Sequence, residues 1–474
     1  MSQILGQLVP GDAKEAQVRA TYTEWMRHGL EVVQGLADRR ANRPGWYSPS
    51  HPVERQPTRR TTWVLRPDHP SAASIEQALR AGWLVSAGTG TEQPAQTGAL
   101  SGLTVAVKDI IDVAGLSVRN GTPRALWREP TESAIAWSRL AADGAQCIGK
   151  AATHEMAWGV TTPEIAHPGH PDHITGGSSG GSAACVAAHA SQGALGTDTG
   201  GSVRIPAALC GVVGFRPTTG AVEMVGITPL APQQDVVGPI AIDVRTCIAM
   251  LEVLLDCPLG PDTDVPRPVH GFRIGVLHRT GQLDPAVGEA YQRTVATLAD
   301  AGADVIPCDT SLPRLAGNVS LLTMLLSSAA LHAETVYADP TGFGGPARAL
   351  LTIGDELTTH AQVIDRARGT LAAETARLFT NNRLDAFLTP TTPCTAPFRG
   401  AETVELAGRS EQVSAALTRF TAWASATAMP AVSVPVPASD MPVGVQIMAP
   451  PHREDTCAHL ALAIEQLLGR ASED

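Results

Sequence analysis

Three lysines stand out in a chain that otherwise uses arginine for its basic side chains. Lysine and arginine together number 35, and the lysines are Lys14, Lys108 and Lys150. Arginine stays protonated in proteins, whereas a buried lysine can lose its proton and act as a base. Lys108 and Lys150 each follow a short apolar run, at 103–107 and 145–149. The sequence therefore offers a base at the end of a buried strand.

Serine and glycine gather in two segments that follow these runs. The stretch 176–182 holds four glycines and three serines, although glycine is the residue that loses most conformational entropy on folding. A phosphate-binding loop would need Gly-Lys-[Ser/Thr] after its glycines, and no lysine is near. The second stretch, "GTDTGGS" at 196–202, offers successive backbone N–H groups for an oxyanion hole, with Ser202 at its end. We favour a polar relay over a phosphate loop.

The relay would work by moving a proton between hydroxyls. A serine hydroxyl is a poor nucleophile until a neighbouring group takes its proton. A neutral Lys108 could take it through Ser178, provided that burial lowers the lysine pKa from about 10.4 by several units. A helix that we expect from about Ser182 adds a favourable field for developing negative charge.

These segments resemble the amidase signature family. The resemblance lies in "GLTVAVKD", "TGGSSGGSAA", "GTDTGGSVRIPA" and "CGVVGFRPT", and it continues in family order through "RIGVL", "LTPTTPCTAP", "FTAWASATAMPAVSVPV" and "MPVGVQIM". It covers the chain from about Ser101 to the C-terminus. The 24-residue step from Ser178 to Ser202 is also that of the family.

The resemblance implies a role for each motif residue. Ser202 is the acyl-accepting nucleophile, Ser178 is the bridging serine after a cis peptide bond, and Lys108 is the base. The backbone N–H groups of four residues form the oxyanion hole, and these residues are Thr199, Gly200, Gly201 and Ser202. Three further residues orient the triad, namely Ser179, Thr197 and Asp198.

Other positions have structural or substrate-binding interpretations. By the resemblance, Lys150 is structural and Arg204 is a structural ion-pair partner. Trp158 lies where the family often places the wall of the acyl pocket, although a core tryptophan is an equal alternative. Trp423 and Gln446 are weaker candidates for the pocket.

The resemblance implies an amidohydrolase that cleaves a C–N bond of a small amide or carbamoyl compound without a metal or cofactor. A glutaminase subunit of a tRNA-dependent amidotransferase, working with partner subunits, is the alternative. An acyltransferase that uses the same acyl-enzyme is a third possibility. The aromatic content of 4% favours aliphatic or small substrates.

The pattern of apolar runs predicts an α/β fold with a large mixed β-sheet flanked by helices on both faces. Strands are expected in six runs, at 103–107, 145–149, 273–277, 385–390, 431–436 and 443–448. Because helical stretches alternate with them, the sheet should be largely parallel, with the last two strands antiparallel. Residues 1–70 should form an N-terminal helical and irregular segment, which packs on the body or joins a homodimer contact. The catalytic domain would then span 71–474.

Composition limits the class of protein. The 474 residues are 43% apolar and 17% charged, and the net charge of −11 argues against binding to nucleic acid or to a membrane surface. The N-terminus lacks a signal-peptide pattern, so we expect a cytoplasmic enzyme. The apolar stretch from Val319 is read as too short to span a bilayer, and forms a buried helix or the wall of a lipophilic pocket. The eight scattered cysteines should be free, mostly buried thiols.

Three histidines invite a metal-site hypothesis. His167, His170 and His173 lie close together, with Glu164 and Asp172 nearby. Prolines and glycines beside them prevent one helical face from presenting the rings together. We therefore favour a solvent-facing loop, with substrate contact and a metal site as less favoured alternatives.

Overall fold

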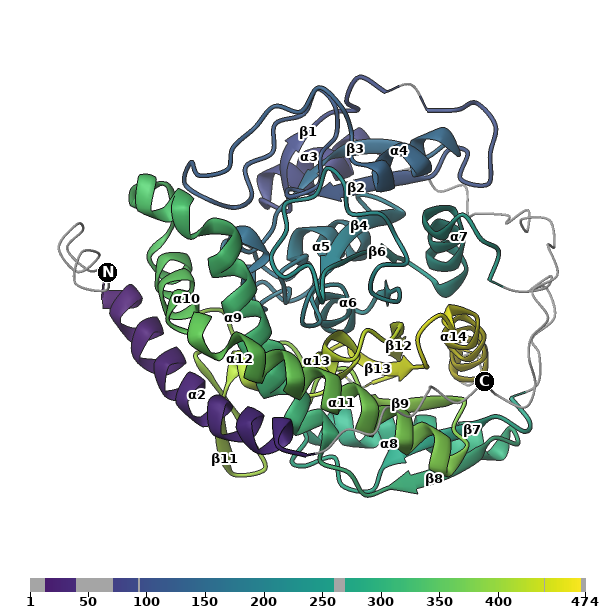
Figure 1. Ribbon diagram of the computed structural model, residues 1–474. Coiled ribbons are helices and arrows are strands. Elements are labelled where there is room, and N and C mark those ends of the chain that lie inside the picture. The colour runs from purple at the N-terminus through teal and green to yellow at the C-terminus, as the bar shows by residue number, and fades with distance from the viewer. Residues whose placement is uncertain (1–12, 40–70, 93, 260–268, 439, 470–474) are drawn as a thin grey trace.

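The computed structural model describes residues 13–39, 71–92, 94–259, 269–438 and 440–469 (Figure 1). Its centre is an eleven-stranded sheet in the order β1-β3-β2-β4-β6-β5-β12-β13-β9-β7-β8. The strands of this sheet are β1 (Leu84–Ala87), β2 (Thr104–Lys108), β3 (Gln146–Ala151), β4 (Gly193–Asp198), β5 (Val213–Arg216), β6 (Val236–Ala241), β7 (Arg273–Leu277), β8 (Asp304–Cys308), β9 (Ala386–Pro390), β12 (Ala431–Val436) and β13 (Val443–Met448). A separate hairpin joins β10 (Thr403–Leu406) to β11 (Arg409–Gln412). All six predicted strands are present.

The strand directions confirm a mixed sheet but not a largely parallel one. Parallel pairing is confined to the groups β3-β2-β4 and β9-β7-β8, and the strands between them pair antiparallel. The antiparallel pairing of β12 with β13 is confirmed. The expectation of a largely parallel sheet is wrong because β5 and β6, two short central strands absent from the predicted set, introduce antiparallel neighbours.

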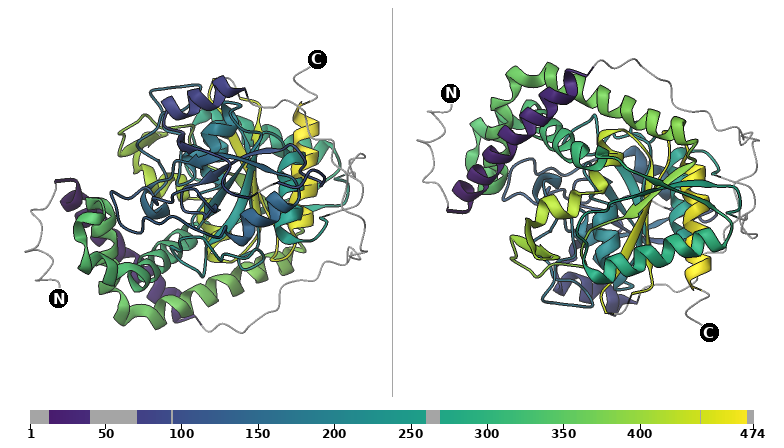
Figure 2. Two further views of the ribbon diagram at one scale, coloured as in Figure 1. Left: turned by 90° about the horizontal axis from the view of Figure 1, so that it is seen from above. Right: turned by 90° about the horizontal axis from the view of Figure 1, so that it is seen from below.

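Helices cover both faces of the sheet (Figure 2). Those on and around it are α3 (Ala72–Arg80), α4 (Ile135–Ala142), α5 (Gly180–Ala187), α6 (Arg204–Cys210), α7 (Val244–Leu255), α8 (Pro285–Asp300), α12 (Val413–Thr418), α13 (Thr421–Ala426) and α14 (Glu454–Gly469). Helices α5 and α6 pack on one face, and α7 and α14, which contact each other, pack on the other. Short 3₁₀ turns lie at Glu155–Ala157, Pro340–Gly342 and Thr358–His360.

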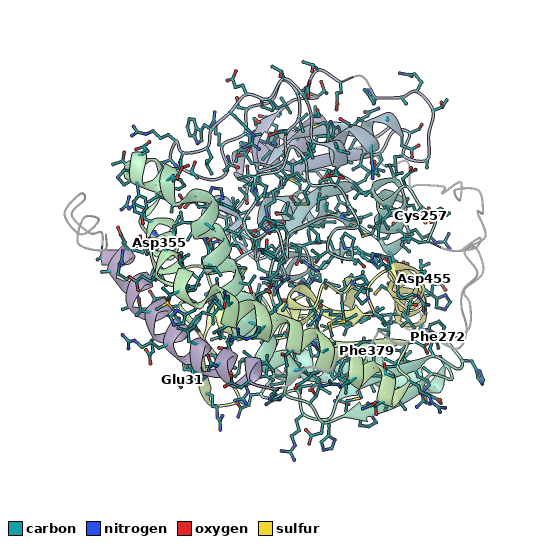
Figure 3. The ribbon with its side chains drawn as sticks, viewed as in Figure 1. Glu31, Cys257, Phe272, Asp355, Phe379 and Asp455 are labelled. Atoms are coloured by element: carbon teal, nitrogen blue, oxygen red, sulfur yellow. The ribbon has the colours of Figure 1, made fainter. Side chains whose placement is uncertain are left out.

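A group of long helices gathers beside the sheet. It comprises α2 (Ala13–Ala37), α9 (Leu312–Ala338), α10 (Gly345–Glu356) and α11 (Ala361–Asn382). Helix α2 contacts the other three and buries Val33 and Leu36 in the same apolar core. The N-terminal helix thus packs on the body, while residues 40–70 lie outside the described part and the boundary at residue 70 stays a prediction. Side chains fill the space between helices and sheet (Figure 3), where Phe379 of α11 is fully buried.

The apolar stretch from Val319 lies within α9. By length and composition alone this 27-residue helix could cross a membrane, because it extends beyond the apolar stretch on both sides. Just over half of its most apolar window is buried within the protein, against α10, α11, α13 and α2. The prediction of a buried helix is therefore confirmed in part. All eight cysteines are free, and all except the half-buried Cys257 are buried, as predicted.

Candidate active site

The β2 and β4 strands bring Lys108 to the centre of the site. They pair in parallel, so Lys108 at the end of β2 lies beside the end of β4. Its Nζ atom lies 2.8 Å from Ser178 Oγ and 2.8 Å from Thr197 Oγ1, and its side chain is fully buried. Burial lowers the pKa of Lys108 to about 7, although Asp198 and Asp235 act in the opposite direction. The neutral form of the amine is therefore far more accessible near neutral pH than that of an ordinary lysine.

Ser178 is presented by a turn in which backbone segments approach unusually closely. The Gly177–Ser178 peptide bond is cis, as the resemblance implies. Helix α5 begins at Gly180, two residues before the expected start at Ser182. A Cβ atom at Gly180 would lie 2.4 Å from Thr175 Oγ1, and one at Gly181 would lie 2.4 Å from a main-chain nitrogen. The glycines are there because the turn has no room for side chains.

Ser179 ties this turn to β4. Its hydroxyl donates to the Thr197 carbonyl at 3.1 Å and accepts from the Thr197 N–H at 3.3 Å. The Thr197 hydroxyl in turn accepts from Lys108. Ser179 and Thr197 therefore hold Lys108 and Ser178 in register, which supports their predicted orienting role.

Ser202 lies against the same turn through its backbone. Its carbonyl accepts a hydrogen bond of 3.2 Å from the Ser179 N–H. Within the described residues, no hydrogen bond joins its hydroxyl to that of Ser178. The structure thus brings Lys108 and Ser178 into direct contact and places Ser202 beside them.

The backbone donors of the turn 199–202 divide into two sets. The N–H of Gly201, at φ +135°, donates to Asp198 Oδ1 at 3.0 Å, so this member of the predicted oxyanion hole is already bound. It is bound because the Asp198 carboxylate folds back over the turn that follows its strand. The N–H groups of Thr199, Gly200 and Ser202 have no hydrogen-bond acceptor among the described residues. Three predicted donors remain for an oxyanion.

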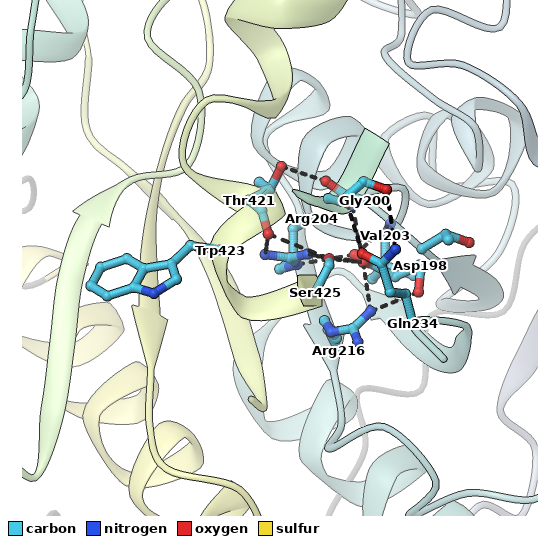
Figure 4. Close-up of polar contacts among 12 residues, drawn as sticks. Asp198, Gly200, Val203, Arg204, Arg216, Gln234, Thr421, Trp423 and Ser425 are labelled. Atoms are coloured by element: carbon cyan, nitrogen blue, oxygen red, sulfur yellow. Dashed lines mark hydrogen bonds and ion pairs between the residues drawn. The ribbon is translucent and has the colours of Figure 1, made fainter. Parts of the chain in front are cut away.

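A buried ion-pair network holds this turn (Figure 4). Asp198 accepts from Arg204 Nη2 at 2.8 Å and from Arg216 Nη1 at 3.0 Å, and all three side chains are fully buried. Burial alone would raise the pKa of Asp198, but the two guanidinium charges hold it well below its ordinary value. The prediction that Arg204 is a structural ion-pair partner is confirmed, and Asp198 acts by fixing the turn.

Asp235 is an important residue that the sequence analysis missed. Its Oδ1 accepts from the Thr199 hydroxyl at 2.6 Å, and its Oδ2 accepts from two backbone N–H groups, those of Leu230 and Ala231. Burial raises its pKa. The adjacent Gln234 exchanges hydrogen bonds with Ser320 of α9, so this loop fastens α9 beside the turn. No motif signalled Asp235, because its contact with the oxyanion turn, through Thr199, spans 36 positions of the chain.

Two of the three predicted pocket residues are fully buried, with their polar groups bound within the protein. Trp423 is fully buried, its indole N–H donates to Thr375 Oγ1 at 2.9 Å, and it lies apart from the Asp198 network (Figure 4). The side-chain amide of Gln446 is also fully buried, where it binds Arg204 and Thr389. Their burial and internal hydrogen bonds favour a place in the core, and the pocket assignment of both residues stays a prediction.

Trp158 remains a candidate for the pocket. It is buried, and its indole nitrogen has no hydrogen-bond partner among the described residues. Tryptophan N–H groups usually find a partner when buried, so a substrate acceptor would satisfy this one. Lys150 has a structural contact, because its buried amine donates to the carbonyl of Ile111.

The histidine loop is only partly exposed to solvent. His167 is buried, with Nε2 2.9 Å from the Leu209 carbonyl and Nδ1 accepting from the N–H groups of Gly169 and His170. The expectation of a solvent-facing loop is wrong for this residue, because its ring organises the loop from inside. Among the described residues, no group of three or more His, Cys, Asp or Glu is arranged to hold a metal ion.

Comparison with known proteins assigns the chain to a family. A family model described as Amidase matches residues 76–458, so the chain belongs to the amidase family and is an enzyme of that family. An amidase of Pseudomonas putida is 34% identical over 354 residues, which cover 71% of this chain and 75% of that protein. A glutamyl-tRNA(Gln) amidotransferase subunit of Synechococcus sp. (strain RCC307) is 30% identical over 418 residues, which cover 78% and 84%.

Solved structures of this family share the fold. A crystal structure of an amidase superimposes with a TM-score of 0.74 at 30% identity, covering 84% of this chain and 96% of that one. The corresponding glutamyl-tRNA(Gln) amidotransferase subunit of Thermotoga maritima gives a TM-score of 0.69 at 25% identity, covering 83% and 90%. The large mixed sheet with flanking helices is therefore the fold of amidase signature enzymes.

Proposed function

We propose that this enzyme is an amidohydrolase that cleaves the C–N bond of a small, non-peptide amide through an acyl-enzyme on Ser202. The observation that carries the proposal is the fully buried Lys108 amine, 2.8 Å from the Ser178 hydroxyl. A buried amine with a pKa of about 7 is suited to general base catalysis near neutral pH. A surface lysine, with a pKa of about 10.4, is protonated at neutral pH and cannot act as a base.

In the first half of the reaction, neutral Lys108 accepts the Ser178 proton while Ser178 accepts the proton of Ser202. The Ser202 oxygen attacks the amide carbonyl, and the free N–H groups of Thr199, Gly200 and Ser202 bind the oxyanion. The leaving amine takes the proton back along the same path. Catalytic hydrogen bonds are often long without substrate, so we expect the contact between Ser178 and Ser202 to close in the substrate complex.

In the second half, water is deprotonated by the same two groups and attacks the acyl-enzyme. When the bond between the acyl carbon and the Ser202 oxygen breaks, the proton returns from Lys108 through Ser178 to that oxygen, which releases the acid product and leaves Lys108 neutral. The chain's own residues provide each proton-transfer step of this cycle, so the proposal includes no metal and no cofactor.

We propose a small aliphatic amide as the substrate and the cytoplasm as the location. The Cβ position of Gly200 lies 3.6 Å from Met324 Cε of α9, which places an apolar side chain beside the oxyanion turn. A homodimer without nucleic-acid or membrane partners is part of the same proposal. The acidic net charge argues against a nucleic-acid partner, and the burial of more than half of the most apolar window of α9 argues against a membrane partner.

A glutaminase subunit of an amidotransferase complex is the second candidate. It is favoured by relatives such as a glutamyl-tRNA(Gln) amidotransferase subunit of Thermus thermophilus, which is 33% identical over 417 residues. A complex component would hydrolyse glutamine and depend on its partners, whereas a free amidase would act alone. An acyltransferase would differ in transferring the acyl group to an added amine or hydroxylamine.

The test is a screen of the purified chain against simple amides, ureas, esters and glutamine, with Ser202→Ala as the matched control. We expect turnover of a small amide by the wild type and none by the variant. Activity confined to glutamine would favour the amidotransferase component, and equal activity of wild type and Ser202→Ala would overturn both proposals.

A further inference from the structure

The segment 154–162, beside the proposed relay, has an unusual backbone. Four of its residues adopt positive φ, namely Met156 (52°), Ala157 (61°), Gly159 (136°) and Thr162 (44°). A β-branched residue such as Thr162 pays a steric penalty in this left-handed region. Strained residues of this kind persist where the surrounding structure holds them, and they concentrate at functional sites.

The His154 side chain connects the two ends of this segment. Its Nδ1 accepts a hydrogen bond from the Thr162 N–H at 3.3 Å and lies 3.5 Å from Thr161 Oγ1. A Cβ atom at Gly159 would lie 2.3 Å from the imidazole Cε1, so the ring fills the space inside the loop. Because Nδ1 is an acceptor, the neutral ring carries its proton on Nε2.

The segment 154–162 forms hydrogen bonds to the backbone of Ser178. The His154 N–H donates to the Ser178 carbonyl at 3.0 Å, and the Thr162 hydroxyl reaches the same carbonyl at 3.4 Å. A Cβ atom at Gly177 would lie 2.7 Å from Thr162 Oγ1, so the two segments are in close contact. Ser178 thus contacts Lys108 through its hydroxyl and the segment 154–162 through its carbonyl.

We propose that His154 is a positioning residue for the amidase reaction: its neutral imidazole locks the segment 154–162 around the Ser178 carbonyl and so fixes the Ser178 hydroxyl between Lys108 and Ser202. The proposal rests on the proposed relay. The imidazole stays neutral because burial, together with the nearby charge of Lys108, lowers the pKa of His154 to about 4.

The test compares two replacements of the ring by the kcat and KM of amide hydrolysis. In His154→Asn, the side-chain oxygen can take the place of Nδ1 as an acceptor, whereas His154→Leu fills similar space without one. A misplacement of about 1 Å at a reacting group costs roughly 100-fold in rate. We therefore expect His154→Leu to lower kcat by about 10- to 100-fold with little change in KM, and His154→Asn to restore most of it.

Two controls keep the result interpretable. His28→Leu changes an exposed histidine of α2 and should leave kcat unchanged. Labelling of Ser202 in the wild type by a fluorophosphonate tests the nucleophile on which the proposed function depends, so its absence would refute that function rather than the role of His154. Equal kcat in His154→Leu and the wild type, or an equal loss in His154→Leu and His154→Asn, would overturn the positioning role.

A second pair of variants covers the case in which His154→Leu does not fold. Thr162→Val removes the hydroxyl that reaches the Ser178 carbonyl, and Thr162→Ser keeps it. We expect fluorophosphonate to label Thr162→Val several-fold more slowly than Thr162→Ser, because one hydrogen bond contributes about 0.5–1.5 kcal/mol, or 2- to 13-fold. Equal labelling rates would contradict the claim that the hydrogen bond from Thr162 to the Ser178 carbonyl positions Ser178.

Discussion

Replacing Lys108 by methionine tests whether the buried amine has the lowered pKa that the relay needs. A fall of the Lys108 pKa from its ordinary 10.5 to about 7 means that burying the charged amine costs about 5 kcal/mol of folding free energy, at about 1.4 kcal/mol for each pH unit. Below pH 7 both folded and unfolded chains hold the proton, so the whole cost of burying the charge is present. Between pH 7 and 10.5 the unfolded chain binds a proton that the folded chain lacks, so the stability of the wild type rises with pH.

Lys108→Met removes this titration. The other ionisable groups are shared, so their contributions cancel when the free energies of unfolding of the two proteins are subtracted. The hydroxyls of Ser178 and Thr197 each lose a partner in the variant, which adds a cost that does not depend on the lysine pKa. The pH dependence of the difference is therefore the informative quantity.

The assay is urea denaturation of both proteins at pH 6, 7, 8 and 9. We expect the wild type to gain about 2 kcal/mol relative to Lys108→Met between pH 7 and 9, and nothing between pH 6 and 7 beyond the tail of the titration. A difference that stays constant from pH 7 to 9 would show that the amine keeps its ordinary pKa. The proposed base would then be charged at neutral pH and unable to act.

Four further results are expected. The kcat/KM of amide hydrolysis should fall below about pH 7 as Lys108 becomes protonated, and a profile that is flat from pH 5 to 8 would exclude Lys108 as the base. Asp235→Asn removes a charge that raises the Lys108 pKa, so the acid limb of that profile should move to lower pH; a move to higher pH contradicts the electrostatics. Asp198→Asn leaves the buried guanidinium groups of Arg204 and Arg216 without their negative partner, so it should lower the free energy of unfolding by about 3–5 kcal/mol. A loss below about 1 kcal/mol would mean that solvent reaches the two guanidinium groups. Trp423→Phe removes the hydrogen bond to Thr375, so it should lower the free energy of unfolding by about 1 kcal/mol and leave KM unchanged. A raised KM would indicate that Trp423 contacts the substrate.

The sequence was informative where a pattern is local. Apolar runs such as 103–107 and 443–448 located strands because burial on both faces leaves a continuous apolar segment. The glycine and serine motifs located the two turns, and the composition singled out Lys108. Strand β6 was not predicted because its sequence, "VVGPIA", contains glycine and proline, which are usually depleted in strands.

What the sequence could not supply depends on contacts between distant segments. Asp235 reaches Thr199 across 36 positions, and Arg204 reaches Ser425 across 221. A position in a motif also does not determine where a side chain points, which is why Trp423 and Gln446 were assigned to a pocket although both side chains are fully buried. The occupied N–H of Gly201 was likewise hidden, because a donor's partner depends on the path of the turn.

The most direct test of the account is the rate and position of fluorophosphonate labelling at pH 8, measured by peptide mass spectrometry in the wild type and in Lys108→Met. We predict a single adduct on Ser202 in the wild type and labelling at least 100-fold slower in the variant, within the range of about 10²–10⁴ that general base catalysis contributes. An adduct on another residue, or a variant that is labelled at the wild-type rate, would contradict the claim that a buried neutral lysine activates Ser202 through Ser178.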